Sequence, residues 1–239
     1  RAPLPPAELP VRTIAGLAAT MADRLMRDLF CTAGFGSCGR VRRATHSGSW
    51  YPDDPEELRA DLQGLLAKVQ EGCAPGGPPK ALIVPHAGLR HCGRTAAHAY
   101  KRVDPSAISR VVVLGTSHRK RLKGCALPAA GVVSYATPFQ DVPLDLDAIE
   151  ELRDTGEFEE LSLGEDEAEH SIEMQLPFTA LQLGQGGDWE LLPLVVGRLS
   201  ADACACYAKH LAPYFHDPGT LFIVSSDFCH WGAKFRFRP

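Results

Sequence analysis

The sequence contains no apolar run of the roughly 18 residues that a membrane-spanning helix requires. It also has no excess of basic residues, since the formal net charge is -4, and this argues against nucleic acid as the main partner. The eight cysteines include no CxxC pair and no zinc-finger spacing. Scattered cysteines in a chain of this size are typical of a reducing compartment, so we expect a cytoplasmic protein without a disulfide framework.

Residues 1–40 differ in composition from the rest of the chain. They open with an Ala-Pro-Leu-Pro-Pro stretch, carry several arginines and have few acids. We expect a leader that is disordered or not native, although an organellar transit peptide has a similar composition. Residues 41–239 carry regular apolar patterns and are long enough to form one domain.

Apolar runs at residues 81–84, 110–114, 191–196 and 221–224 have the length and composition of buried parallel strands. Stretches with helical spacing lie between and around them. The helices expected from this spacing cover residues 55–69, 94–102, 145–154, 169–183 and 201–214, with Pro177 kinking or breaking the fourth. The order of these elements predicts an α/β fold with a mostly parallel sheet flanked by helices.

Three of the expected strands are each followed by a histidine. His86, His118 and His230 come shortly after three different strand ends, and Asp227 lies close to the last of them. Ligands of open α/β sheets bind beyond the carboxyl ends of the strands. We therefore expect these side chains to share one polar pocket.

The residue types in this pocket suggest a divalent metal. Imidazoles with a carboxylate resemble the facial triad of non-haem iron(II) sites, whereas imidazoles with a thiolate suit zinc or copper. We expect His86 and His118 to be metal ligands, because each follows a rigid strand closely. His230 lies farther along a loop and suits a general acid or base.

The segment Glu169-His170-Ser171-Ile172-Glu173 offers a further polar group. In a helix, His170 and Glu173 share one face and can point into the same pocket. The alternative is that both residues serve the start of the helix, where acids are favoured by the helix dipole. The spacing does not separate these two interpretations.

Seven motifs, in this order, resemble the Memo family, whose animal members mediate receptor-driven cell motility. They are HSGSWY at 46–51, PHAG at 85–88, CG at 92–93, AAHAY at 96–100, LGTSH at 114–118, EHSIEM at 169–174 and SSDFCHWG at 225–232. The resemblance covers residues 41–238 and implies a fold like that of the class III extradiol ring-cleaving dioxygenases. It places His86 and His118 on the family's metal-ligand positions, and Asp227 and His230 on polar positions of the same pocket.

The resemblance implies a metal-binding redox or signalling protein, with iron or copper in the pocket and zinc as a further option. His230, Asp227 and His170 are then the expected catalytic groups of a metal-dependent oxidoreductase. The alternative is a non-catalytic scaffold that uses the dioxygenase-like pocket for a small-molecule ligand or a phosphopeptide. Family chains continue well past the last motif and carry a third proposed metal ligand, a cysteine, in that later part, so the resemblance implies a domain truncated at its C-terminus.

Overall fold

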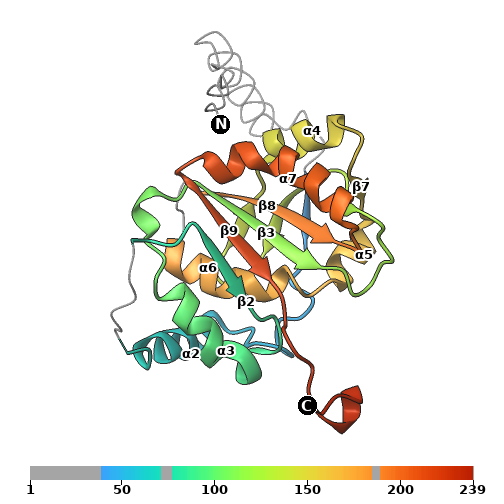
Figure 1. The fold of residues 1–239 in the computed structure, drawn as a ribbon. Coiled ribbons are helices and arrows are strands. Elements are labelled where there is room, and N and C mark those ends of the chain that lie inside the picture. Colours follow the sequence, from blue (N-terminus) through green and yellow to red (C-terminus); the bar gives the residue numbers. More distant parts are fainter. Residues whose placement is uncertain (1–38, 71–76, 185–188, 239) are drawn as a thin grey trace, which may run out of the picture. The chain divides into compact units, whose positions relative to one another are not determined.

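The computed structural model describes residues 39–70, 77–184 and 189–238, and the strands in these ranges form two sheets (Figure 1). The expected leader lies outside the described residues except for its last two positions, and Arg40 begins the first strand, β1 (Arg40–Arg42). The division of the chain into a leader at residues 1–40 and one domain at residues 41–239 stays a prediction. No helix in the described ranges is long and apolar enough to cross a membrane.

The larger sheet contains all four strands that the apolar runs predict. β2 (Ala81–Val84), β9 (Thr220–Ser225), β3 (Arg110–Thr116) and β8 (Glu190–Val196) lie side by side in this order and run parallel. β4 (Cys125–Leu127) pairs with β8 in antiparallel orientation, and β7 (Glu159–Glu160) pairs in parallel with β4. The fold is therefore α/β with a mostly parallel sheet, as the sequence predicts.

The smaller sheet consists of β1, β5 (Val132–Ala136) and β6 (Asp141–Pro143). β5 pairs in parallel with β1 and in antiparallel orientation with β6. No apolar run indicates these strands in the sequence, because each is short and mixes buried with more exposed positions.

Three of the longer helices begin where a side chain binds their free N–H groups. Asp54 accepts from the N–H groups of Glu56 and Glu57 at the start of α2 (Pro55–Ala67), as its position in the sequence predicts. Asp145 and Ser200 cap α4 (Leu146–Asp154) and α7 (Ala201–His216) in the same way. α3 (Leu89–Tyr100) begins earlier than the expected residue 94. The shorter helices are η1 (Pro105–Ala107), α5 (Leu163–Ala168), η2 (Glu173–Gln175), α6 (Leu176–Leu183) and η3 (Ala233–Phe235).

Helices cover both faces of the larger sheet. α3 lies between β2 and β3 in the chain, whereas α7 leads from β8 back to β9, so the two connections cross the sheet in opposite directions. Because crossovers between parallel strands are right-handed, α3 and α7 lie on opposite faces. α2 and α6 pack with α3, and Figure 1 shows α7 away from these three helices.

Residues 169–183 form an α-helix only in their second half, whereas their spacing predicts a helix throughout that Pro177 kinks or breaks. Residues 169–172 are not helical, η2 follows, and α6 begins at Leu176. Pro177 lies in the first turn of α6, where its missing N–H is tolerated, so it begins a helix instead of kinking one. Residues 169–180 are all buried, and contacts with the sheet therefore override helical periodicity in setting their path.

Gly115 of β3 allows residues 169–172 to approach the sheet closely. A Cβ atom on Gly115 would lie 2.5 Å from Ser171 Oγ and 2.6 Å from Ile172 Cγ1. The Ser171 hydroxyl donates a hydrogen bond of 2.9 Å to the Thr116 carbonyl at the end of β3. The absence of a side chain at Gly115 thus fixes how the segment sits against the strand that leads to His118.

We expect Gly115→Ala to lower the free energy of unfolding by about 1–3 kcal/mol, because the added methyl group overpacks this contact. Gly64→Ala is the matched control, since a Cβ atom on Gly64 in α2 meets nothing within 4 Å. Alanine is favoured over glycine inside a helix by about 1 kcal/mol, so this second variant should gain stability. Urea unfolding measures both changes. A Gly115→Ala protein with an unchanged free energy of unfolding would contradict the close contact between Gly115 and residues 171–172.

Candidate metal centre

The parallel strands bring distant residues to one edge of the larger sheet. Val84 at the end of β2 and Gly115 near the end of β3 both pair with Ser225, the last residue of β9. His86, His118 and Asp227 each follow one of these strand ends. Side chains that are far apart in the sequence therefore meet beyond the carboxyl ends of the strands, where α/β sheets bind their ligands.

Three histidines form a compact group at this edge. One ring nitrogen from each of His86, His118 and His170 lies within 4.8 Å of the others. The ring centroids are 5.1 Å apart for His86 and His118, 4.3 Å for His118 and His170, and 5.4 Å for His86 and His170. Within the described ranges, this is the group of histidines, cysteines and acids that is close enough to hold one metal ion.

Glu169 orients the ring of His118. Its Oε2 accepts the backbone N–H of His118 (2.6 Å), and its Oε1 lies 3.0 Å from both His118 Nδ1 and the backbone nitrogen of Ser171. Burial by itself would raise the pKa of Glu169, but the hydrogen bonds from His118 and Ser171 lower it to about 2. The ionised carboxylate can only accept, so His118 donates its Nδ1–H to Glu169, and a lone pair on this ring can lie only on Nε2.

His86 is held from two sides. Its backbone N–H donates to Asp227 Oδ1 (2.9 Å), and its Nδ1 lies 3.0 Å from Ser225 Oγ. Burial lowers the pKa of His86, although the charge of Asp227 opposes this shift. Burial therefore favours a neutral ring with one lone pair.

His170 has little polar support. Its Nδ1 is buried without a hydrogen-bond partner among the described residues, and the ring packs against Trp50 and His46 with centroids 4.7 Å and 5.8 Å away. Burial and then the charge of His118 lower the pKa of His170 to about 4, so the ring is neutral near pH 7. A buried ring nitrogen that makes no hydrogen bond, with Glu169 Oε1 3.6 Å away and two further imidazoles beside it, fits a metal site.

Asp227 and His230 lie beside this group. His230 Nε2 is 3.4 Å from Asp227 Oδ2, and the His230 side chain is 54% exposed. Both residues line a cavity of about 790 Å³ together with the three histidines. Trp50, Arg90, His91, Lys234 and Phe235 form other parts of its wall. The acid and the base that the sequence indicates therefore face the same cavity as the histidine group.

Glu173 does not share this cavity with His170, as a common helix face would require. It is fully buried, pairs with Arg42 of β1, and accepts hydrogen bonds from the Tyr51 hydroxyl (2.8 Å) and from His46 at its backbone N–H (2.8 Å) and Nδ1 (2.9 Å). Glu173 is the first residue of η2, but its carboxylate bonds to side chains and a backbone N–H from other elements rather than to the N–H groups of that helix. Arg42 is 131 positions away in the sequence, so no local pattern reveals this pairing. The network holds His46 beside His170.

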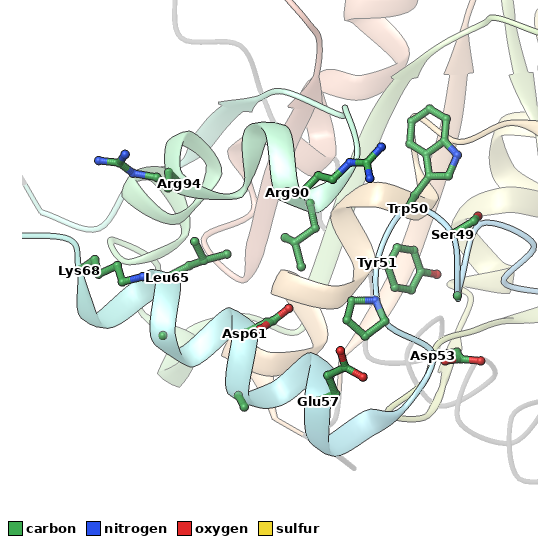
Figure 2. Close-up of a pocket in the computed structure, with 15 residues that line it drawn as sticks. Ser49, Trp50, Tyr51, Asp53, Glu57, Asp61, Leu65, Lys68, Arg90 and Arg94 are labelled. Carbon is green, nitrogen blue, oxygen red and sulfur yellow. The ribbon is translucent and has the colours of Figure 1, made fainter.

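A second cavity, of about 640 Å³, lies between α2, α3 and the loop that carries Trp50 (Figure 2). Figure 2 shows Glu57 and Asp61 on α2 and Arg90 and Arg94 on α3. Trp50 and Arg90 line both cavities. Trp50 therefore borders both cavities, and its indole lies against the His170 ring, with centroids 4.7 Å apart.

The low pKa of Glu169 predicts how stability depends on pH. In the unfolded chain, the pKa of the Glu169 carboxyl has its ordinary value of 4.5. The ionised carboxylate therefore stabilises the folded protein fully above pH 4.5, and this stabilisation is lost as the pH falls from 4.5 to about 2. We expect Glu169→Gln to remove this part of the pH dependence. Urea unfolding of both proteins across this pH range measures the effect. An equally steep fall of the free energy of unfolding with pH in the wild type and in Glu169→Gln would contradict the low pKa of Glu169.

Known proteins match most of the chain. A sequence model of the family described as "Memo-like protein" matches residues 42–238. The Danio rerio "Protein MEMO1" is 47% identical over 197 residues, which cover 82% of this chain and 65% of that protein. The Homo sapiens "Protein MEMO1" is 46% identical over the same length, with the same shares covered. The Caenorhabditis elegans "Protein memo-1 homolog" is 43% identical over 207 residues, which cover 86% of this chain and 57% of that protein.

The chain thus spans less than two thirds of the length of these relatives. The matched residues include all seven motifs that carry the sequence resemblance and every member of the histidine group. The family match over this range, together with the identity to the MEMO1 proteins, shows that the chain belongs to the Memo family.

Proposed function

We propose that the protein binds a divalent transition metal, iron or copper, through His86, His118 and His170, and that it acts in redox chemistry or signalling. The observation that carries this proposal is the three-imidazole group, whose nitrogens lie within 4.8 Å of one another. The lowered pKa values of His86 and His170 favour rings with free lone pairs at neutral pH. His170, which the sequence indicates as a catalytic group, is proposed here as the third ligand.

The donor set supports this choice of metal. Imidazole nitrogens suit iron, copper and zinc, whereas calcium and magnesium prefer oxygen ligands. Glu169 behind His118 forms the carboxylate–histidine arrangement that orients many metal ligands and increases their basicity. Iron or copper bound here would supply one-electron redox chemistry, and zinc would supply Lewis acidity.

Asp227 and His230 are proposed to hold and move a proton beside this group. The Asp227 carboxylate faces His230 Nε2 at 3.4 Å, and the exposed His230 ring can exchange protons with water. The adjoining cavity of about 790 Å³ has room for a small-molecule ligand. The link to cell motility follows from the family resemblance, and the cytoplasmic location follows from the cysteine pattern; both are proposals.

We expect the purified protein to bind Co²⁺, a spectroscopic probe of such sites, with one ion per chain. His86→Ala, His118→Ala and His170→Ala should each weaken binding by more than the roughly 10–100-fold that loss of an outer-shell partner costs. His98→Ala is the matched control, because His98 is an exposed residue of α3. Absorption titrations measure the affinities, and elemental analysis of gently purified protein identifies the native metal.

Binding should also weaken in acid, because protons compete with the metal for the same imidazole nitrogens. A wild-type protein that holds no metal and binds no Co²⁺ would contradict the proposal. An equal loss of binding in His98→Ala would assign the affinity to histidines in general rather than to this group.

The cavity wall favours a second candidate, a non-catalytic binding protein. Arg90 and Lys234 supply positive charge, and Trp50 and Phe235 supply aromatic faces, as an anionic aromatic group such as the phosphotyrosine of a peptide requires. We expect phenyl phosphate to bind the metal-free protein and Arg90→Ala to weaken this binding. Arg94→Ala, which changes only the neighbouring groove, is the control. Calorimetry checks this, and binding that needs a loaded metal would favour the first candidate.

A further inference from the structure

A neutral histidine binds a metal only through the ring nitrogen that carries no proton. For His118 the position of the ring proton follows from Glu169, whose carboxylate can only accept. His86 has no carboxylate at its Nδ1, and the atom found there is Ser225 Oγ, 3.0 Å away. A hydroxyl both donates and accepts, so the proton of His86 depends on where the hydroxyl hydrogen of Ser225 points.

Ser225 is buried, and its hydroxyl has three polar neighbours. Its Oγ lies 2.6 Å from the carbonyl oxygen of Ser171, 2.8 Å from Nε2 of Gln175 and 3.0 Å from Nδ1 of His86. The Ser171 carbonyl can only accept a hydrogen bond, and an amide nitrogen can only donate one. The single hydrogen of the hydroxyl therefore belongs either to Ser171 or to His86.

The orientation of the Gln175 amide is fixed by contacts that do not involve Ser225. Its Nε2 lies 3.1 Å from the carbonyl oxygen of Pro85, which can only accept, and its Oε1 lies 2.9 Å from the Tyr100 hydroxyl. Exchanging the nitrogen and oxygen of this amide would turn two acceptors toward each other at Pro85. The amide nitrogen therefore faces Ser225 and donates to its Oγ.

The Ser171 carbonyl oxygen is the closest of the three neighbours, and it can contact Oγ favourably only by accepting a hydrogen bond. The Ser225 hydroxyl therefore donates its hydrogen bond to Ser171. Oγ then presents only lone pairs to Gln175 and His86, and Nδ1 of His86 must donate. We propose that Ser225 is a positioning residue that fixes the neutral His86 ring with its proton on Nδ1 and so leaves Nε2 as the lone-pair nitrogen. The use of this nitrogen for a metal rests on the proposed function, whereas the tautomer does not.

The opposite tautomer has no support in the structure. A proton on Nε2 would find Asp227 Oδ2 at 4.0 Å, beyond hydrogen-bond distance, while Nδ1 would face the lone pairs of Ser225 Oγ. Gln175 strengthens the arrangement, because it binds both Ser225 and the carbonyl of Pro85, the residue before His86. Residues 169–175 thus set the ring protons of two histidines, of His118 directly and of His86 through Ser225.

Long-range ¹H–¹⁵N correlation NMR of the histidine rings distinguishes the two tautomers and needs no metal. We expect His86 of the metal-free wild-type protein, at mildly alkaline pH, to carry its proton on Nδ1. His86→Ala identifies its signals. A ring that carries the proton on Nε2 overturns the proposal, and this measurement does not require any variant of Ser225 to fold.

Ser225→Ala removes the acceptor, so we expect a mixed or reversed tautomer and a Co²⁺ affinity lowered about 10–100-fold, as for other outer-shell partners. Ser225→Thr keeps the hydroxyl and should restore the tautomer and most of the affinity. Ser226→Ala is the matched control, because the Ser226 hydroxyl bonds only to the backbone carbonyl of Asp227 among the contacts of the described residues (3.3 Å). It should leave both readouts unchanged.

An unchanged tautomer in Ser225→Ala overturns the role of Ser225. A changed tautomer with unchanged Co²⁺ affinity overturns the link between that role and the metal. A wild-type protein that shows the expected tautomer but binds no metal refutes the proposed function and leaves the positioning of His86 intact.

Discussion

The buried path of residues 169–175 is the constraint on which the rest of the site depends. Gly115 gives the segment room against β3, and Ser171 binds it to the ends of β3 and β9 through Thr116 and Ser225. The same segment carries His170 into the cavity and places Glu169 behind His118. The strand ends by themselves bring His86 and His118 to one edge of the sheet. Residues 169–175 add His170 to these two histidines and orient their rings.

Burial also decides the charges at the site. Glu169 stays ionised because backbone N–H groups and His118 bind it, and these hydrogen bonds outweigh the cost of its burial. His86 and His170 have no comparable compensation, so burial lowers their pKa values. The other deeply buried acid of the segment, Glu173, is satisfied by Arg42, His46 and Tyr51. The site therefore combines lone-pair nitrogens with the negative charges of Glu169 and Asp227, which suits a cation.

Much of the fold was predictable because its signals are local. The apolar runs gave the four parallel strands, the acid before Pro55 gave the start of α2, and the motifs gave the Memo family. The strands β1, β5 and β6 were not predictable, because they are short and gain their stability from pairing with each other. The helix expected over residues 169–183, kinked or broken at Pro177, forms only from Leu176 on, because the buried residues before it follow their contacts rather than their helical periodicity.

The sequence by itself determined the α/β class and the arrival of His86, His118 and Asp227 at one edge, since the position of a residue after a strand is a local property. Only the tertiary structure decided that His170 joins the two histidines and that Glu173 turns away to Arg42. It also decided that Ser225 stands between Ser171, Gln175 and His86. These contacts join residues from separate elements of the chain, and no local period or spacing records them.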